Sequence, residues 1–161
     1  MSLKGTLKID DIAGESKSAE HEDEIDVYGV HWKVEQRSSS MKGSGRTQSR
    51  ADISCVKFYK EVDASSPYLA LASMRGQHIP EIEFNARKDS GDAHLDYLKI
   101  TMTDCIISFY EMENTGDDEV QVIRESICIS CESINMLYTL QADDHSAGAE
   151  HEMEFNIVQG K

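Results

Sequence analysis

The stretch LDYLKITMTDCIISF, residues 95–109, decides the fold of this chain. Its apolar residues occupy even positions over residues 98–102 and odd positions from Cys105 onward. An apolar side chain at every second residue is typical of a strand with one buried face, and a change of phase indicates a bulge or bend. We place that bend near Thr103 and Asp104, so the two halves of the strand turn opposite sets of residues inward.

The next long segment shows the same change of phase. Its apolar residues are odd as far as Cys131 and even from Ile134 to Leu140. Two long strands that each change their inward face belong to a sheet that curls from one layer into another, not to a flat one. The sequence therefore predicts a mainly β fold, a small antiparallel β-barrel or curved two-sheet sandwich, in a single domain over residues 1–161. A last, short strand is expected over residues 153–158.

Residues 25–36 predict an earlier strand with one buried and one solvated face. The polar side of this strand holds His31 and Lys33. We expect the apolar side to lie in the core. Its members are Tyr28, Val30, Trp32 and Val34.

One flanking α-helix is predicted over about residues 67–75. Ser66 can accept hydrogen bonds from the first free amides, and Pro67 suits the first helical position. Gly76 suits the position just after the last turn. The apolar residues between these signals predict about three turns with one face packed on the sheet.

A long extended loop, residues 38–50, separates two of the predicted strands. Seven of its 13 residues are Ser or Gly, and Met41 is its one strong hydrophobe. A loop of this length exceeds a normal hairpin turn, and long exposed loops in compact domains are usually functional or disordered. Because it carries Lys42, Arg46 and Arg50 on an otherwise acidic chain, the loop is suited to contact an acidic patch.

The net charge of −14, from 30 acidic and 16 basic residues, limits the choice of partners. Such a surface repels nucleic-acid phosphates and anionic membranes, which argues against both. No apolar run approaches the ~20 residues that cross a bilayer. Residues 1–6 lack the apolar stretch of a secretory signal, so we expect synthesis in the cytoplasm and any export to proceed without a cleaved signal peptide.

The four cysteines are Cys55, Cys105, Cys128 and Cys131. In a chain without a secretory signal, reduced and buried thiols are the expectation. Cys128 and Cys131 have CxxC spacing, but residues three apart on a strand point to opposite faces, so their sulfurs should diverge. A zinc site needs two further ligands at suitable spacing, and the sequence has no second CxxC. We therefore favour structural thiols over a metal or redox role.

Histidines stand among carboxylates at residues 20–24, 143–145 and 150–152. Such groups can bind a divalent metal or transfer protons. None has the ligand order of a known metal motif, and no nucleophile elbow or phosphate-binding glycine loop is present. We expect solvated loop charge, no cofactor, no metal and no enzymatic activity. The alternative is a monomeric acidic domain that uses these loops to bind metal or hydrolyse a substrate.

A series of short motifs runs in order along nearly the whole chain. They are Lys8-Ile9-Asp10, Gly14-Glu15-Ser16, His21–Val27, Phe58–Asp63 with Ser66-Pro67, Gly76–Pro80, Arg87-Lys88, Tyr97-Leu98, Ser108, Glu125 and Phe155-Asn156-Ile157. Each motif is weak alone. Because the motifs occur in this order and at these spacings, the chain resembles the haemolysin-coregulated protein (Hcp) family, the tube subunit of the bacterial type VI secretion system.

The resemblance implies a non-enzymatic structural protein whose copies form a six-membered ring. Rings would stack head to tail into a tube, enclosed by a contractile sheath and capped by a valine–glycine-repeat spike protein. The tube is secreted by the type VI route, and the ring lumen carries or chaperones effector proteins. A specialised member that serves only as an effector adaptor is the alternative within the family.

The resemblance also assigns roles to two groups of residues. The loop over residues 38–50 is the candidate for ring stacking, through Met41, Lys42, Arg46 and Arg50. On the polar side of the strand over residues 25–36, the candidates for contact with effectors in the lumen are His31 and Lys33.

Overall fold

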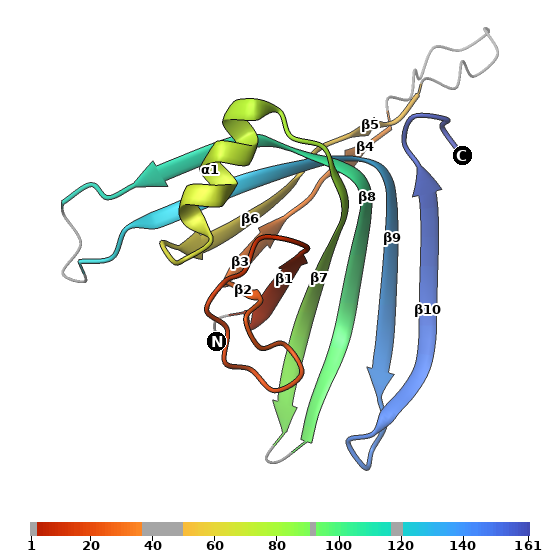
Figure 1. Cartoon of the computed structure of the whole chain (residues 1–161). Coiled ribbons are helices and arrows are strands. Elements are labelled where there is room, and N and C mark those ends of the chain that lie inside the picture. The colour runs from red at the N-terminus through yellow and green to blue at the C-terminus, as the bar shows by residue number, and fades with distance from the viewer. Residues whose placement is uncertain (1–2, 37–49, 91–92, 117–120) are drawn as a thin grey trace, which may run out of the picture.

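The computed structural model describes residues 3–36, 50–90, 93–116 and 121–161. These residues form ten strands and one helix, arranged as a strongly curved sheet with the helix against one side (Figure 1). In chain order the elements are β1 (Gly5–Ile9), β2 (Ile25–Val27), β3 (Gly29–His31), β4 (Val34–Glu35), β5 (Asp52–Ile53), β6 (Val56–Glu61), α1 (Ser66–Arg75), β7 (Ile79–Ser90), β8 (Ala93–Glu113), β9 (Arg124–Gln141) and β10 (Ala147–Asn156).

Two long strands, β8 and β9, run through both layers of the barrel. The first half of β8 pairs with β7 and with the second half of β9. The second half of β8 pairs with the first half of β9, which pairs in turn with β6. The strand order is β2-β1-β7-β8-β9-β6-β3, and β10 pairs with the second half of β9. This curled antiparallel sheet confirms the barrel-like fold that the change of phase predicts.

The barrel closes where one short stretch changes its pairing partner. β2 pairs with β1, and after Tyr28 the chain continues as β3, which pairs with β6. The backbone N–H of Tyr28 donates to the carbonyl oxygen of Tyr59 at 2.9 Å. The two ends of the sheet are therefore joined through residues 25–31, which leaves the barrel nearly closed.

The bend in β8 lies at the predicted place. Asp104 has a positive φ of 55°, and Met102 and Cys105 on either side of it are both buried. The register shift against β9 falls slightly later, between Ile107 and Phe109. The backbone thus bends at Asp104 and gains its extra residue a few positions further on.

The core fills the space between the two layers. Phe58 from β6 and Phe84 from β7 are fully buried, with ring centroids 5.1 Å apart at an angle of 45°. Large side chains of this kind each stabilise a fold by about 1.5–3 kcal/mol when buried. The other large, fully buried hydrophobic side chains are Leu7, Ile25, Leu69, Ile82, Met102, Ile107, Ile127, Ile129 and Ile134.

Helix α1 packs Leu69 and Ala72 inward and ends at Gly76, whose φ of 57° suits glycine. The helix begins at Ser66, one residue before the predicted start, and the prediction of Ser66 as its cap is wrong. Ser65 occupies the cap position, while the Ser66 hydroxyl accepts the N–H of Asp63 at 2.9 Å. Across the described ranges, no helix has the length and apolar character needed to span a bilayer.

The prediction of one half-buried strand over residues 25–36 is wrong. The segment forms three short strands, and its supposed inner face is largely exposed: Tyr28, Val30 and Val34 are 38%, 37% and 51% accessible. Trp32 is only partly buried at the edge of the core. The period of two correctly indicates extended backbone, but β3 lies at an edge of the main sheet and β4 lies outside it, so no opposing layer of the chain covers these side chains.

The last strand is longer than predicted. β10 begins at Ala147 rather than at residue 153, and it pairs with β9 from Gln141 to Ser133. Its first six residues are exposed and are small (Ala147–Ala149) or polar (Glu150–Glu152), so they lack the apolar alternation on which the prediction depended. Backbone hydrogen bonding to a long neighbour extends the strand instead.

The expectation of four reduced thiols is also wrong. Cys55 and Cys128 form a disulfide, while Cys105 and Cys131 are free. The pairing of β6 with β9 brings Cys55 and Cys128 together, with a Cα–Cα distance of 5.6 Å that suits a disulfide. Cys131 lies opposite Cys105 on β8, so the sulfurs of the CxxC do diverge as predicted. Burial raises the pKa of the Cys105 thiol to about 12 and that of Cys131 to about 11, which makes both unreactive.

Candidate assembly surfaces

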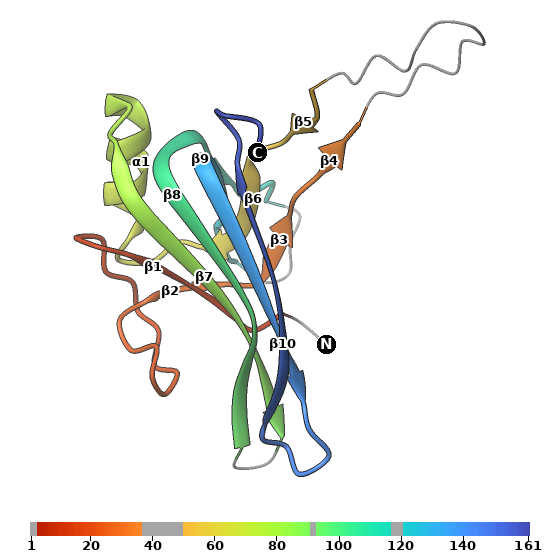
Figure 2. The same ribbon diagram turned by 90° about the vertical axis from the view of Figure 1, so that its right-hand side faces the viewer.

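A two-stranded arm leaves the barrel at one end. β4 and β5 pair with each other and lie apart from the main sheet (Figures 1 and 2). At their base, the N–H of Ser54 donates to the carbonyl oxygen of Lys33 at 2.9 Å, and the N–H of Lys33 donates to the Ser54 hydroxyl at 2.9 Å. These bonds fix the base of the β4–β5 pair. We call β4 and β5 the arm.

Of the four predicted stacking residues, only Arg50 lies among the residues that the structure describes. Met41, Lys42 and Arg46 lie outside the described residues. Arg50 is bound within its own chain: its guanidinium donates to the carbonyl oxygen of Ile157 at 2.7 Å and to that of Val158. Arg50 therefore braces the arm against the C-terminal turn.

The predicted lumen residues lie beside the arm on an uncovered ribbon. His31, at the end of β3, and Lys33 are both exposed. Lys33 has Glu35 as an ion-pair partner, with 3.5 Å between Nζ and Oε2. The apolar residues Tyr28, Val30 and Val34 are exposed along the same ribbon. Hydrophobic side chains gathered at one place on a monomer's surface commonly mark a contact with another protein.

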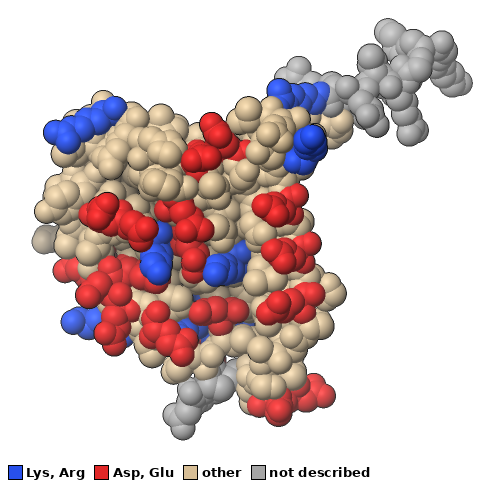
Figure 3. Space-filling model, turned by 45° about the vertical axis from the view of Figure 1, so that its right-hand side comes forward, with Lys and Arg blue, Asp and Glu red and all other residues tan. Residues whose placement is uncertain are grey.

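Several strands in the described part of the chain pair on one side alone, among them β3 and β10. β3 pairs with β6 alone, and β10 pairs with β9 alone. A free edge presents unpaired N–H and C=O groups to which another chain can add. The edge of β10 carries Glu150, Glu152 and Glu154, and acidic side chains also predominate on the face shown in Figure 3.

A buried ion pair holds the connection between β6 and α1. Lys60 Nζ lies 3.0 Å from Glu125 Oε1, and both side chains are fully buried. Lys60 also reaches Asp63 at 3.1 Å and the Ser66 hydroxyl at 3.3 Å, and that hydroxyl donates to Glu125. Burial and the hydrogen bond to Glu125 raise the pKa of Tyr110. Buried charges are tolerated only when paired in this way, so the network anchors the connection and supplies no open site.

A histidine clip fastens the loop over residues 10–24. His21 Nδ1 lies 2.8 Å from Glu24 Oε2, and Nε2 lies 2.7 Å from Asp96 Oδ2 on β8. Burial lowers the pKa of His21, but the hydrogen bond to Asp96 and the charges of Glu24 and Asp96 raise it by more, so the net shift is upward. Arg87 completes the attachment by donating to the carbonyl oxygen of Ala19 at 2.8 Å.

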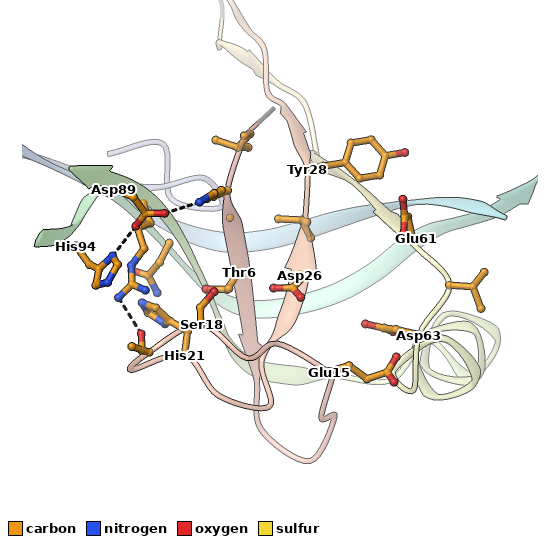
Figure 4. Close-up of a pocket in the computed structure, with 18 residues that line it drawn as sticks. Thr6, Glu15, Ser18, His21, Asp26, Tyr28, Glu61, Asp63, Asp89 and His94 are labelled. Carbon is orange, nitrogen blue, oxygen red and sulfur yellow. Dashed lines mark hydrogen bonds and ion pairs between the residues drawn. The ribbon is translucent and has the colours of Figure 1, made fainter. Parts of the chain in front are cut away.

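The clipped loop forms one wall of a groove of about 620 Å³ (Figure 4). β1, β2, the end of β6 and the β7–β8 hairpin supply the remaining walls. At one end, Asp89 is ion-paired with Lys4 at 2.5 Å and with His94 at 2.7 Å. The hydrogen bonds from Lys4 and then His94 lower the pKa of Asp89 to about 2. Toward the other end lie Glu15 and Glu61.

The described ranges contain no group of three or more His, Cys, Asp and Glu side chains arranged to hold a metal ion. Two of the histidine and carboxylate clusters instead make contacts within the chain. His21 is clipped as above, and Asp144 accepts the N–H and hydroxyl of Ser146, which lowers the pKa of Asp144.

Comparison with known proteins identifies the family. The family model described as "Type VI secretion system effector, Hcp" matches residues 6–139. The chain belongs to the Hcp family. Protein hcp1 of Pseudomonas aeruginosa is 29% identical to this Hcp-family chain over 160 residues, which cover 99% of this chain and 98% of that protein.

Solved structures agree with this assignment. Hcp1 from Salmonella typhimurium superposes with a TM-score of 0.80 at 29% identity, covering 100% of this Hcp-family chain and 99% of the other. A structure described as a type six secretion system protein shares the fold at a TM-score of 0.90 and 22% identity, covering 99% and 98% of the two chains. A type VI secretion system effector from Yersinia pestis reaches 0.74 at 28% identity, covering 94% and 98%.

The fold explains why several motifs of the resemblance occur together. Phe58–Asp63, Ser66-Pro67 and Glu125 meet in the buried ion-pair network. Sequence reasoning missed this network, although a signal existed: Lys60 lies in phase with the buried Val56 and Phe58, and a lysine on a buried face requires a partner. The His21–Asp96 contact had no such signal, because its partners are 75 residues apart.

Proposed function

We propose that this Hcp-family chain assembles into a closed ring and that rings stack into the secreted tube of a type VI secretion system. The observation that carries the proposal is the uncovered apolar ribbon of Tyr28, Val30 and Val34 on a chain with a net charge of −14. Because the acidic surface repels other copies, association needs an attractive contact. The exposed hydrophobic side chains supply such a contact when a second copy covers them.

The free edges of β3 and β10 support a contact between unlike surfaces of two copies. Such a head-to-tail contact generates a ring when the rotation between neighbours closes. The number six comes from the family. Within such a ring, His31 and Lys33 face the lumen and contact effectors, while Met41, Lys42, Arg46 and Arg50 serve the stacking of one ring on the next.

The partners follow from the same proposal. They are further copies of the chain, the contractile sheath, the valine–glycine-repeat spike protein and effector proteins in the lumen. The role is structural rather than enzymatic, and the protein leaves the cell by the type VI route.

Light scattering on the purified full-length chain tests the ring. We expect a mass several times that of the 18.0 kDa chain. Val30→Asp places a charge in the apolar ribbon that a second copy would cover in the ring, and it should reduce the mass to that of the monomer. Met74→Asp, at an exposed apolar residue of α1, is the matched control and should leave the ring intact. A wild-type monomer at tens of micromolar would overturn the proposal.

A further inference from the structure

The groove beside the clipped loop exposes carboxylates that no cation of the described ranges neutralises. Glu15, Asp26 and Glu61 all line the groove, and all three are exposed. Glu15 and Asp26 form no ion pair with any described residue. Glu15 accepts only the N–H of Ala64, at 3.2 Å. These two carboxylates are therefore available to a positively charged ligand.

The cationic side chains of the groove are already engaged. Lys4 and His94 both bind Asp89, at 2.5 Å and 2.7 Å. Arg87, which also lines the groove, lies 3.5 Å from Asp96. The groove thus presents net negative charge to whatever enters it.

The carboxylates of the groove are spread along its length. Figure 4 shows Asp89 at one end, Asp26 near the middle, and Glu15 and Glu61 toward the other end. A divalent metal requires several oxygen ligands that converge on one point. No group of that kind exists among the described residues. Separated carboxylates instead suit a ligand whose positive charges are themselves spaced along a chain.

The floor of the groove holds a polar group without a partner. Thr6 lies directly opposite Asp26 in the pairing of β1 with β2, and directly opposite Asn85 in the pairing of β1 with β7. The three side chains therefore project from one face of the sheet, and all three line the groove. Thr6 is only 6% exposed, yet its hydroxyl has no hydrogen-bond partner among the described residues. Buried polar groups are rarely left unpaired, so the hydroxyl indicates a missing ligand group.

The size and the apolar part of the lining fit a small molecule. The groove has a volume of about 620 Å³. Sites for small molecules typically enclose about 300–1,000 Å³ and combine apolar surface with a few polar groups. Val62 lines the acidic end and is 42% exposed. This side chain offers a surface for the methylene groups of a ligand.

We propose that this groove binds a linear polyamine, a small organic cation whose ammonium groups are separated by short methylene chains. One ammonium group donates to Asp26 and to the Thr6 hydroxyl. A second donates to Glu15 or Glu61, and the methylenes between them lie on Val62. Hydrogen bonds from an ammonium to a carboxylate are roughly twice as strong as neutral ones. The inference goes beyond the proposed function, because every residue of the site belongs to one chain.

Calorimetric titration of the full-length protein with spermidine tests the proposal. At physiological ionic strength we expect saturable binding with one spermidine per chain. Magnesium chloride of equal ionic strength is the control, since a point charge cannot reach separated carboxylates together. Absence of saturable binding, or complete displacement of spermidine by magnesium, would leave only diffuse attraction to an acidic surface and would overturn the proposal.

Three substitutions locate the site. Asp26→Asn should weaken spermidine binding about tenfold, and Thr6→Val, which removes the hydroxyl but keeps the shape, about threefold. Glu22→Gln is the matched control: it alters the net charge as Asp26→Asn does, and Glu22 is exposed on the same side of the molecule but does not line the groove. The control should change the affinity less than twofold. Equal weakening by Asp26→Asn and Glu22→Gln would contradict a site in the groove.

Hydrogen exchange gives a readout that does not depend on a variant. Spermidine should slow the exchange of the amides in β1, β2 and the clipped loop, and leave those of β10 unchanged. The exposed edge of β10 is the competing acidic surface, with Glu150, Glu152 and Glu154. Slower exchange in β10 alone would place the cation at that edge and reject the groove.

Discussion

The buried network around Lys60 and the exposed ribbon that leads into the arm both place side chains where they are energetically costly. The two regions differ in how that cost is met. Lys60 and Glu125 would each be costly alone in a core, yet they are paired with each other inside the chain. Tyr28, Val30 and Val34 are costly in water, and their own chain leaves them uncovered. The comparison shows that one region is completed within the subunit, while the other is left for a second molecule.

The largest expected effect comes from breaking the buried network. Lys60→Met leaves Glu125 buried without its cation and should reduce the free energy of unfolding by about 3–5 kcal/mol. Urea denaturation followed by circular dichroism measures the loss. The double variant Lys60→Met with Glu125→Leu removes both charges and should recover most of the stability. A loss below about 1 kcal/mol in the single variant would show that the network does not anchor the connection.

The disulfide lies between the two regions and should have the next largest effect. Cys55 and Cys128 are 73 residues apart, so their bond restricts the unfolded chain considerably. Cys55→Ser should lower the free energy of unfolding by about 2–4 kcal/mol, and a reducing agent should have the same effect on the wild type. Cys131→Ser is the control and should not abolish the sensitivity to reduction. Four reactive thiols in the denatured, unreduced protein, instead of two, would contradict the bond.

The histidine clip should give a smaller effect that depends on pH. The net pKa of His21 is raised above its ordinary value of 6.5, so the stability from the charged form is fully present below pH 6.5 and is lost as the pH rises through the folded-state pKa. Neutral His21 has one N–H for two carboxylates. The loss should be no more than about 1 kcal/mol. Unfolding measured between pH 5.5 and 8.5 should show it, and His21→Asn should flatten that portion of the profile. An unchanged slope in His21→Asn would contradict the assignment.

The smallest effect on stability is expected at the arm. Arg50→Gln removes the hydrogen bonds to the carbonyl groups of Ile157 and Val158, and because Arg50 is exposed, the free energy of unfolding should change by less than about 0.5 kcal/mol. Hydrogen exchange at Asp52–Ser54 should nevertheless accelerate, since the brace on β5 is gone. The amides of the β6–β9 pairing serve as the internal control. Unchanged exchange at both places would mean that Arg50 does not hold the arm.

Strand and helix positions could be predicted from the sequence wherever buried residues recur with a simple period. The change of phase around Asp104 predicted the curled sheet, and Pro67 and Gly76 predicted the helix to within one residue. The same period failed over residues 25–36, because alternation reports extended backbone and not the presence of a layer to cover it. The candidate stacking and lumen residues remain predictions, since each acts between molecules.

The order of apolar and polar residues, which is a local property, determined by itself that this chain is a bent antiparallel sheet with one helix. The ordered motifs determined its family resemblance. Only the tertiary structure decided that Cys55 bonds to Cys128, that Lys60 is neutralised by Glu125, and that Glu15, Asp26 and Thr6 share one groove. Each of these contacts joins residues that are distant in the chain, and they become neighbours only when strand register places them side by side.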